Sequence, residues 1–384
     1  MIRRGSDRGA REWHPGGVTA PRAPRVPVRD SIQALPAYVP GARIPVGASA
    51  YKLSSNENPY PPLPSVLAAI ADAAADVNRY PDMFATELVE RIAQHLTVTG
   101  GVPVGPENVV VGNGSVAVLQ HVLDTVVEPG DEVVMPWRSF EAYPITVAVA
   151  GGVSVQVPVT ADGRLDLPAM AAAITERTRV VLVCSPNNPT GPVVHQGELD
   201  AFLAQVPGDV LVVLDEAYVE FVRDPDVADG PATFAAHRNV VLLRTFSKAY
   251  GLAGLRVGFA VARPRLASAL RSASTPFGVN HVAQRAAIAS LGAVDELLER
   301  VEALVAERTR LVEGLRDQGW DLPDAQGNFV WFDLGERTAA RAAESTEAGV
   351  LVRPFAGEGV RVSVGEREAT DLFLRVAAGW RTAR

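Results

Sequence analysis

Short, unbroken apolar runs alternate with stretches of helical periodicity from about residue 64 onward. The runs are Val109 to Val111, Glu132 to Met135, Val153 to Val157, Val180 to Cys184, Val210 to Leu214 and Val240 to Leu243. Runs of this length are typical of strands that are buried on both faces of a parallel sheet. Helical spacing follows several of them, at residues 116–127, 168–174 and 198–205. The alternation predicts an α/β fold with a mainly parallel sheet, whose ligand would lie beyond the carboxyl ends of the strands.

The rhythm changes after Asn280, which indicates a second unit. A long helical stretch at 295–319 precedes candidate strands at 328–333, 350–353 and 360–364, with candidate helices at 338–347 and 366–378. This order favours a smaller α+β domain over residues 291–384, beside a large domain over residues 63–290. Residues 31–62 show little periodicity and many Pro, Gly and Asn, so we expect an N-terminal arm that wraps across the surface.

Residues 1–30 differ from the rest of the chain in charge. They hold seven arginines against Asp7, Glu12 and Asp30, and they are rich in Pro and Gly. Because this stretch lacks the apolar segment of a signal peptide, we expect a disordered leader, or one added by an upstream start codon. An arm that binds nucleic acid is the less favoured alternative.

Composition excludes several classes of protein. Hydrophobic residues make up 47% of the chain and charged residues 21%, as in a packed globular protein. The net charge of -8 argues against a nucleic-acid binder, and no run approaches the ~20 apolar residues that cross a bilayer. We therefore expect a cytoplasmic protein with neither nucleic acid nor membrane as a partner.

Cysteine and histidine add little chemistry. Cys184 is the single cysteine of the chain, which excludes an internal disulfide and fits a reducing compartment. It ends an apolar run, so we expect a buried core thiol. The six histidines never fall at metal-ligand spacing, and we expect no metal site.

One lysine is more informative than its surroundings. Lysine occurs twice among the 36 lysines and arginines, at Lys52 and Lys248. Arginine supplies a cation equally well, but its guanidinium stays protonated and cannot act as an amine nucleophile. Lys248 follows the last apolar run, so we expect an amine there for Schiff-base chemistry, and Lys52 is expected to be an ordinary surface lysine. The alternative is that Lys248 is a surface lysine as well.

Polar residues gather where four of the candidate strands end. The four groups are Asp215 with Tyr218, the loop Ser185–Gly191, the turn Gly112–Ser115, and Thr245 with Ser247, Lys248 and Arg256. Each alone has an ordinary explanation as a helix cap or a loop. The glycine turn before a helix, however, presents free N–H groups to an anion, and hydroxyls with cations suit a phosphate beside an amine.

Six motifs in register resemble the fold-type-I pyridoxal-phosphate aminotransferases, in the branch of histidinol-phosphate aminotransferase. The motifs are Asn56–Pro59, Asn78–Pro81, Ser185–Gly191, Asp215–Tyr218, Thr245–Gly258 and Val360–Gly365, within a resemblance that spans about residues 31–381. The resemblance implies the family's fold, with a mainly parallel seven-stranded sheet in a large domain and a smaller α+β domain. It also implies an enzyme that carries pyridoxal 5'-phosphate.

The resemblance implies a role for each matched residue. Lys248 would form a Schiff base with the cofactor and later move the substrate proton as a free amine. Asp215 would pair with the ring nitrogen and keep it protonated. The other implied cofactor contacts are Tyr218 and Asn188 on the phenolate oxygen, Phe140 stacked on the ring, and Gly114, Ser115, Thr245, Ser247 and Arg256 around the phosphate.

The substrate and the second subunit are also implied by the resemblance. Arg361 matches the arginine that grips the substrate carboxylate, where a two-pronged donor suits a two-oxygen anion. Arg353, Asn328 and Asn188 match further substrate contacts. Tyr80 would reach the phosphate of a neighbouring subunit, which implies a homodimer with shared active sites; otherwise Tyr80 is simply an aromatic in a turn.

Two departures from the histidinol-phosphate pattern concern the substrate. Val116-Ala117 after the glycine turn, and Trp137–Glu141 around the stacking position Phe140, look like the actinobacterial aromatic amino acid aminotransferases. We therefore favour amino transfer between an aromatic amino acid, phenylalanine or tyrosine, and 2-oxoglutarate. The main alternative is a histidinol-phosphate aminotransferase of histidine biosynthesis, since a few pocket contacts can reverse such a preference. A lyase that decarboxylates a phosphorylated amino acid is a more distant one.

Overall fold

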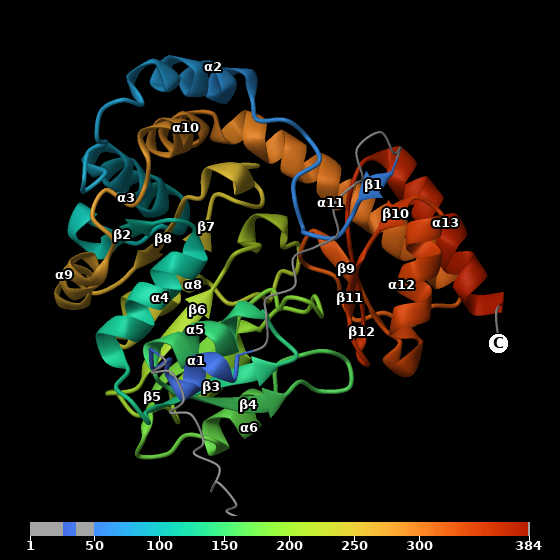
Figure 1. The fold of residues 1–384 in the computed structure, drawn as a ribbon, viewed down its shortest axis with the longest axis horizontal. Helices are drawn as coiled ribbons and strands as arrows, with labels where there is room; N and C mark the ends of the chain where they lie inside the picture. The colour runs from blue at the N-terminus through green and yellow to red at the C-terminus, as the bar shows by residue number, and fades with distance from the viewer. Residues whose placement is uncertain (1–25, 36–49, 383–384) are drawn as a thin grey trace, which may run out of the picture.

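The computed structural model describes residues 26–35 and 50–382, and most of them fold around one seven-stranded sheet. Figure 1 shows this sheet in the larger, left-hand part of the molecule. Its strands lie in the order β2-β8-β7-β6-β5-β3-β4. Their bounds are Val109–Gly112 (β2), Glu132–Trp137 (β3), Val153–Pro158 (β4), Thr178–Cys184 (β5), Leu211–Asp215 (β6), Val240–Thr245 (β7) and Gly258–Val261 (β8). Within this sheet β8 runs in the direction opposite to the other six strands, which are parallel to one another. The prediction of a mainly parallel α/β fold is therefore confirmed.

The apolar runs form strands because the sheet is covered on both faces. Alternate residues of β6 belong to opposite cores, with Val212 and Leu214 in one and Val213 in the other. On the Val213 side lie α4 (Ser115–Val126), α5 (Ala142–Ala150) and α9 (Pro264–Ala273). The other side carries α3 (Thr86–Gly100), α6 (Leu167–Ala172), α7 (Gln196–Leu203), α8 (Gly230–Ala236) and α10 (His281–Gly292), with α2 (Pro64–Ala73) packed on α10.

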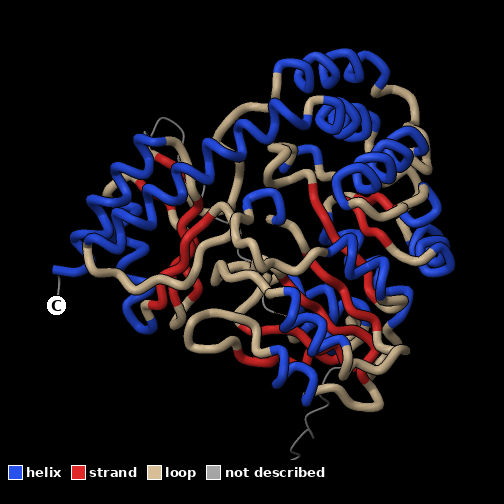
Figure 2. Tube along the Cα trace, turned by 180° about the vertical axis from the view of Figure 1, so that it is seen from behind, coloured by secondary structure: helices blue, strands red, loops and turns tan. Residues whose placement is uncertain are grey.

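A second, smaller sheet lies beside the first. It is antiparallel in the order β11-β12-β9, with bounds Arg353–Phe355, Gly359–Ser363 and Phe329–Asp333. The helices of this part are α11 (Val294–Asp317), α12 (Thr338–Glu347) and α13 (Arg367–Thr382), and Figure 2 shows the long α11 leading into it. We call α2 to α10 the large-sheet region and α11 to α13 the small-sheet region. The division into domains near residue 290 stays a prediction.

Aromatic side chains fill the core of the small-sheet region. Trp380 lies edge-on to Phe332 and to Phe373, with ring centroids 5.5 Å apart in both pairs. Trp320 packs edge-on against Phe332 at 5.0 Å. Large rings that meet edge to face combine extensive apolar burial with favourable electrostatics. This cluster therefore fills the small-sheet side of a hydrophobic core that continues into the large-sheet region.

Part of the expected N-terminal arm, in the segment that leads into α2, is buried. Its strand β1 (Tyr51–Lys52) pairs in parallel with β10 (Val350–Leu351) of the small-sheet region. The next residues are buried, with Leu53 at 3% and Asn56 at 0% exposure. A course across the surface does not hold for these residues, because a stretch without periodicity can still be buried when side chains and neighbouring strands satisfy its backbone. The helix α1 (Asp30–Gln33) precedes it, and residues 1–25 of the expected leader (residues 1–30) lie outside the described residues.

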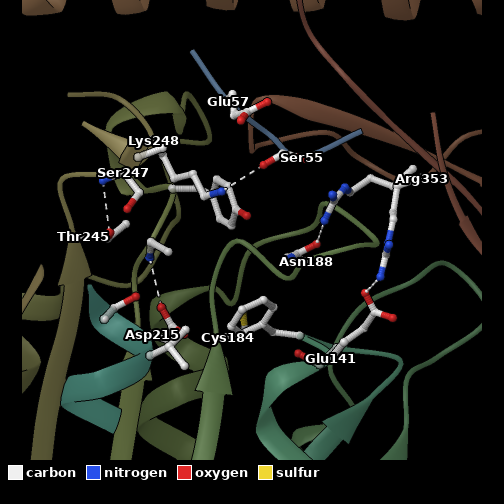
Figure 3. A pocket seen from close by; sticks show the side chains of 18 of the residues that line it. Ser55, Glu57, Glu141, Cys184, Asn188, Asp215, Thr245, Ser247, Lys248 and Arg353 are labelled. Carbon is white, nitrogen blue, oxygen red and sulfur yellow. Dashed lines mark hydrogen bonds and ion pairs between the residues drawn. The ribbon is translucent and has the colours of Figure 1, made fainter. Parts of the chain in front are cut away.

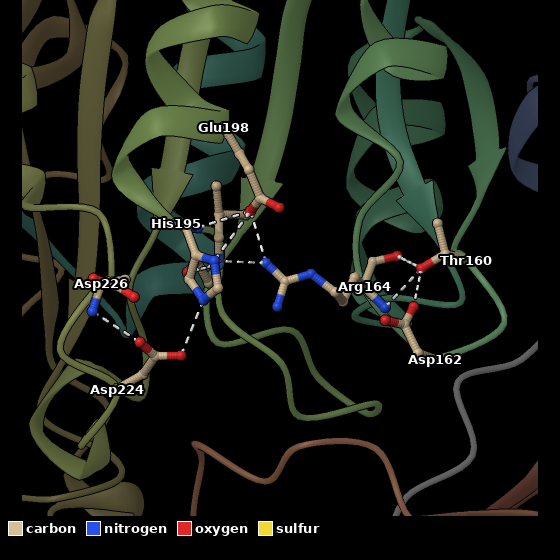
Figure 4. A network of polar contacts seen from close by, with 9 residues as sticks. Thr160, Asp162, Arg164, His195, Glu198, Asp224 and Asp226 are labelled. Carbon is tan, nitrogen blue, oxygen red and sulfur yellow. Dashed lines mark hydrogen bonds and ion pairs between the residues drawn. The ribbon is translucent and has the colours of Figure 1, made fainter.

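A polar network ties together loops that follow the strands of the large sheet (Figure 4). The ring of His195 contacts Asp224 through Nε2 at 3.0 Å and Arg164 through Nδ1 at 3.3 Å. Arg164 also donates to Glu198 Oε2 at 2.7 Å. The network therefore links the loops that follow β4, β5 and β6.

Among the helices of residues 26–35 and 50–382, none combines the length and apolar character that a membrane span requires.

Candidate active site

A cavity of about 260 Å³ lies beyond the carboxyl ends of β5, β6 and β7, between the two regions. Eleven residues singled out from the sequence line it: Ser115, Phe140, Asn188, Asp215, Tyr218, Thr245, Ser247, Lys248, Arg256, Arg353 and Arg361. The others that line it were not assigned a cofactor or substrate contact from the sequence, although several lie within the quoted motifs: Ser54, Ser55, Glu57, Val116, Ser139, Glu141, Cys184, Ala217, Ala253 and Phe355. The polar residues that follow neighbouring parallel strands thus lie around one cavity, beyond the carboxyl ends of the strands, where ligands of such sheets bind.

Lys248 extends into this cavity from the turn after β7 (Figure 3). Its Nζ donates to the carbonyl oxygen of Ser55 at 3.2 Å and lies 5.7 Å from the centroid of the Tyr218 ring. Burial, followed by the nearby guanidinium of Arg361, lowers the pKa of Lys248 to about 7. The amine is therefore available in its uncharged form near neutral pH, as a nucleophile or proton carrier must be.

Asp215, the last residue of β6, is buried on the floor of the cavity. Its Oδ2 accepts a hydrogen bond from the Tyr143 hydroxyl at 2.7 Å, and its Oδ1 accepts one from the Ala217 N–H at 3.2 Å. Burial outweighs these bonds and raises the pKa of Asp215 to about 6. Tyr143 was not identified from the sequence, although it lies in the run that holds Phe140 and packs edge-on to that ring at 5.6 Å.

The opposite end of the cavity is suited to an anion. The first turn of α4 begins at Ser115, and the Ser247 hydroxyl accepts a hydrogen bond from Arg256 Nη1 at 3.3 Å. Gly114 must be glycine, since it has φ +81° and an added Cβ would lie 2.5 Å from Arg256 Nη2. A Cβ on Gly258 would lie 2.4 Å from the Ser115 nitrogen. Both glycines allow strand, helix start and guanidinium to converge on one point, where N–H groups and a cation favour negative charge.

Arg361 of β12 approaches the same cavity from the small-sheet region. Its Nη1 donates to Asn188 Oδ1 at 2.6 Å, and its Nη2 donates to the Ser54 carbonyl at 2.9 Å. Asn56 Nδ2 donates to the Tyr218 hydroxyl at 3.0 Å. Ser54 was not identified from the sequence and Asn56 was noted only within a motif, because the contacts of both depend on the burial of the segment after β1.

Tyr80 and Asn328, two residues predicted to contact the cofactor or substrate, do not line the cavity, whereas Cys184 does. Tyr80 is 83% exposed and stacks on Phe277 with ring centroids 4.7 Å apart, away from the cavity of its own chain. Asn328 is buried behind the cavity, where its Nδ2 donates to the Asn56 carbonyl at 3.2 Å. The roles given to both stay predictions. Burial raises the pKa of Cys184 to about 12, so its thiol is inert, as expected of a core cysteine.

The donor set of the cavity fits pyridoxal phosphate. An amine of lowered pKa suits its aldehyde, a buried carboxylate suits its ring nitrogen, and a helix start with a guanidinium suits its phosphate. The three groups come from Lys248, Asp215 and the Ser115–Arg256 end. Because all of these residues line one cavity, they could contact the aldehyde, the ring nitrogen and the phosphate of a single pyridoxal phosphate molecule.

Comparisons with known proteins agree with this geometry. The family model "Aminotransferase class I and II" matches residues 49–376. The chain is 57% identical to an aromatic amino acid aminotransferase of Streptomyces avermitilis, over 92% of this chain and 97% of the relative. It is 53% identical to one of Thermobifida fusca, over 91% of this chain and 96% of that protein. A histidinol-phosphate aminotransferase of Sinorhizobium meliloti, solved with pyridoxal-5'-phosphate, superposes with a TM-score of 0.81 at 30% identity, covering 91% of this chain and 97% of that chain.

Proposed function

Because the chain belongs to the class I and II aminotransferase family, we propose that it transfers the amino group of an aromatic amino acid, phenylalanine or tyrosine, to 2-oxoglutarate. The names of its relatives in actinobacteria support this substrate class. One observation carries the chemistry: the amine of Lys248, with a pKa of about 7, shares a cavity with the buried carboxylate of Asp215. Pyridoxal phosphate, when bound, supplies the electron sink that no side chain can provide.

The residues at the base of the cavity would manage protons. Lys248 would bind the cofactor covalently and, once released, take the proton from the substrate α-carbon, for which an amine with a pKa near neutrality is suited. Asp215 would hold a proton at the ring nitrogen, since a buried carboxylate favours a cationic neighbour. Tyr143 would keep Asp215 oriented through its 2.7 Å hydrogen bond. We propose Tyr143 as a positioning residue, since it acts through Asp215.

The remaining residues would bind and orient. Ser115, Thr245, Ser247 and Arg256, with the N–H groups near Gly114, would hold the phosphate at the start of α4. Tyr218 and Asn188 would bind the phenolate oxygen, and Phe140 would cover the ring. Arg361, already oriented by Asn188 and Ser54, would bind the substrate carboxylate with two parallel N–H groups.

We also propose that the enzyme is a cytoplasmic homodimer. Tyr80 and Phe84 are exposed by 83% and 60%, and Met83 by 44%, so large apolar side chains gather in one short exposed segment. Such a cluster favours an interface with a second copy. Tyr80 would then reach the phosphate of the partner chain. Light scattering would test this, and a monomer that retains full activity would contradict it.

The central test is spectroscopic and kinetic. The purified enzyme should absorb as a pyridoxal Schiff base, change on addition of phenylalanine and recover with 2-oxoglutarate. Borohydride reduction and peptide mapping should find the adduct on Lys248, and Lys248→Ala should abolish turnover. Lys52→Ala is the matched control, because it removes the other lysine, whose ion pair with Glu57 is partly exposed. A preference for histidinol phosphate over phenylalanine by a factor of about 100 would overturn the substrate assignment in favour of the histidinol-phosphate enzyme.

A further inference from the structure

An ion pair inside the cavity lies between the two regions. Arg353 Nη2 donates to Glu141 Oε2 at 2.6 Å, and both residues line the cavity (Figure 3). The side chain of Arg353 is 7% exposed and that of Glu141 is 30% exposed. A guanidinium so deeply buried needs a counter-charge, because an uncompensated buried cation is strongly destabilising. In the cavity of this chain, Glu141 supplies that charge.

Arg353 and Arg361 form one wall of the cavity. They are direct cross-strand partners of β11 and β12, so their side chains lie on the same face of the small sheet. Both guanidinium carbons lie near the Phe355 ring, at 5.6 Å for Arg353 and 5.9 Å for Arg361. Arg361 donates to the neutral oxygens of Asn188 and Ser54, whereas Arg353 donates to a carboxylate. Arg353 is thus held by an ion pair to a residue of the large-sheet region.

Glu141 also lies at the start of a helix. It is the N-cap residue of α5, a helix of nine residues whose positive end favours a negative charge nearby, and the Glu141 side chain makes no capping hydrogen bond of its own there. The arginine can therefore be drawn toward another anion while the carboxylate stays in place. Pairing of Arg353 with another anion breaks its ion pair with Glu141, however, and the negative charge of Glu141 repels any anion that binds nearby.

We propose that Glu141 is a specificity-determining residue, which by pairing with Arg353 favours substrates with an uncharged side chain over substrates that carry a second anionic group. The proposal rests on the proposed aminotransferase function. An aromatic ring leaves the pair intact, whereas a phosphate or a second carboxylate must compete with Glu141 for Arg353. The 2-oxoglutarate acceptor belongs to the second class, so Glu141 would favour the aromatic donor at the expense of the dicarboxylate acceptor.

The chain contains a matched control for this pair. Arg138 and Glu358 form a second ion pair between the same loop and the same hairpin of the small sheet. Arg138 also packs on Trp137, with its guanidinium carbon 4.2 Å from the ring centroid. Unlike Glu141 and Arg353, neither Arg138 nor Glu358 is among the residues that line the cavity. Removal of Glu358 therefore weakens the link between the regions and leaves the charge inside the cavity unchanged.

The test compares holoenzymes of wild type, Glu141→Gln and Glu358→Gln. Inhibition constants are measured for hydrocinnamate, which carries one carboxylate and a phenyl ring, and for glutarate, which carries two carboxylates. In Glu141→Gln the ratio of the hydrocinnamate constant to the glutarate constant should rise about tenfold, because a partly buried charge is worth on the order of one decade of affinity. In the same variant, KM for 2-oxoglutarate should fall and KM for phenylalanine should not. Glu358→Gln should leave the ratio at the wild-type value.

Three outcomes decide the matter. An unchanged ratio in Glu141→Gln, or an equal change in Glu358→Gln, would overturn the proposal. If Glu141→Gln is poorly folded by circular dichroism, Arg353→Gln replaces it and should weaken glutarate without a matching loss for hydrocinnamate. An equal loss for both ligands would overturn the proposal as well. The wild-type assay separates this from the parent function, since a wild type that does not transaminate phenylalanine refutes the function and not the role of Glu141.

Discussion

The hydrogen bond from Tyr143 to Asp215 allows a quantitative prediction. Asp215 is buried, and its pKa of about 6 lies above the value of 3.8 for an exposed aspartate. The Tyr143 hydroxyl is the side-chain donor that lowers this pKa most, across 2.7 Å. Tyr143→Phe removes that donor and keeps the ring, so the ionised form of Asp215 loses a buried hydrogen bond.

The magnitude follows from the charge on the acceptor. A hydrogen bond to a charged group contributes about 1.5–3 kcal/mol, and one pKa unit corresponds to about 1.4 kcal/mol. The pKa of Asp215 should therefore rise by about one to two units in Tyr143→Phe. At neutral pH the fraction of ionised Asp215 then falls about two- to tenfold, and the affinity for pyridoxal phosphate should fall by a similar factor.

The pH dependence of stability gives a measurement that needs no cofactor. A carboxyl whose folded pKa is raised above its unfolded value destabilises the fold as pH rises from 3.8 through about 6. In Tyr143→Phe the folded pKa of Asp215 is higher, so the loss of folding stability continues to a higher pH. Apoprotein unfolding in urea should show a difference between Tyr143→Phe and wild type of about 1.5–3 kcal/mol near pH 8, where Asp215 is ionised. Near pH 5, where it is protonated in both proteins, the difference should be about 1 kcal/mol or less.

Two results would refute this reasoning. The first is a difference in unfolding free energy that is the same at both pH values, since only the ionised carboxylate makes the bond strong. The second is an undiminished effect of Tyr143→Phe in an Asp215→Asn background, where no charge remains to be stabilised.

Three further predictions concern stability. Wild-type apoprotein should become more stable from about pH 7 to about pH 9, since the pKa of Lys248 is about 7 when folded and 10.5 otherwise. Lys248→Met should flatten this rise in thermal unfolding, and parallel curves would count against it. Gly258→Ala should cost about 1–3 kcal/mol in urea unfolding because its Cβ would meet backbone at 2.4 Å, whereas Gly254→Ala, with nothing within 4 Å of its Cβ, should cost little. Arg244→Leu should cost about 3–5 kcal/mol by leaving the buried Glu216 without its ion pair, and a loss below about 1 kcal/mol would contradict this.

Most of the large sheet could be predicted from the sequence, since a strand buried on both faces is visible as an apolar run. The runs at 109–111 and 240–243 correspond to β2 and β7. The strand between them in space, β8, was missed because it begins with Gly258 and follows a turn in which Arg256 has φ 58°. The single stretch predicted at 350–353 is divided between β10 and β11, which pair with different partners.

The site residues could be predicted where they end a strand, as Asp215 does, or follow one closely, as Lys248 does. They could also be predicted where a motif resembles that of a known family. Contacts between distant segments were not predictable. Tyr143 meets Asp215 across 72 positions, and Glu141 meets Arg353 across 212. Such pairs arise only when separately folded elements dock, and no local pattern records the register of that docking. The segment after β1 was misjudged for the same reason.

The burial of that segment has a consequence for the order of folding. The Asn56 N–H donates to Ser363 Oγ at 2.8 Å, a contact that spans 307 positions. A contact of such separation closes late, because the entropy of a long loop must be overcome before the contact contributes. During synthesis, this part of the cavity wall must wait until β12 has left the ribosome. Capacity to bind cofactor should therefore appear after the large sheet has formed.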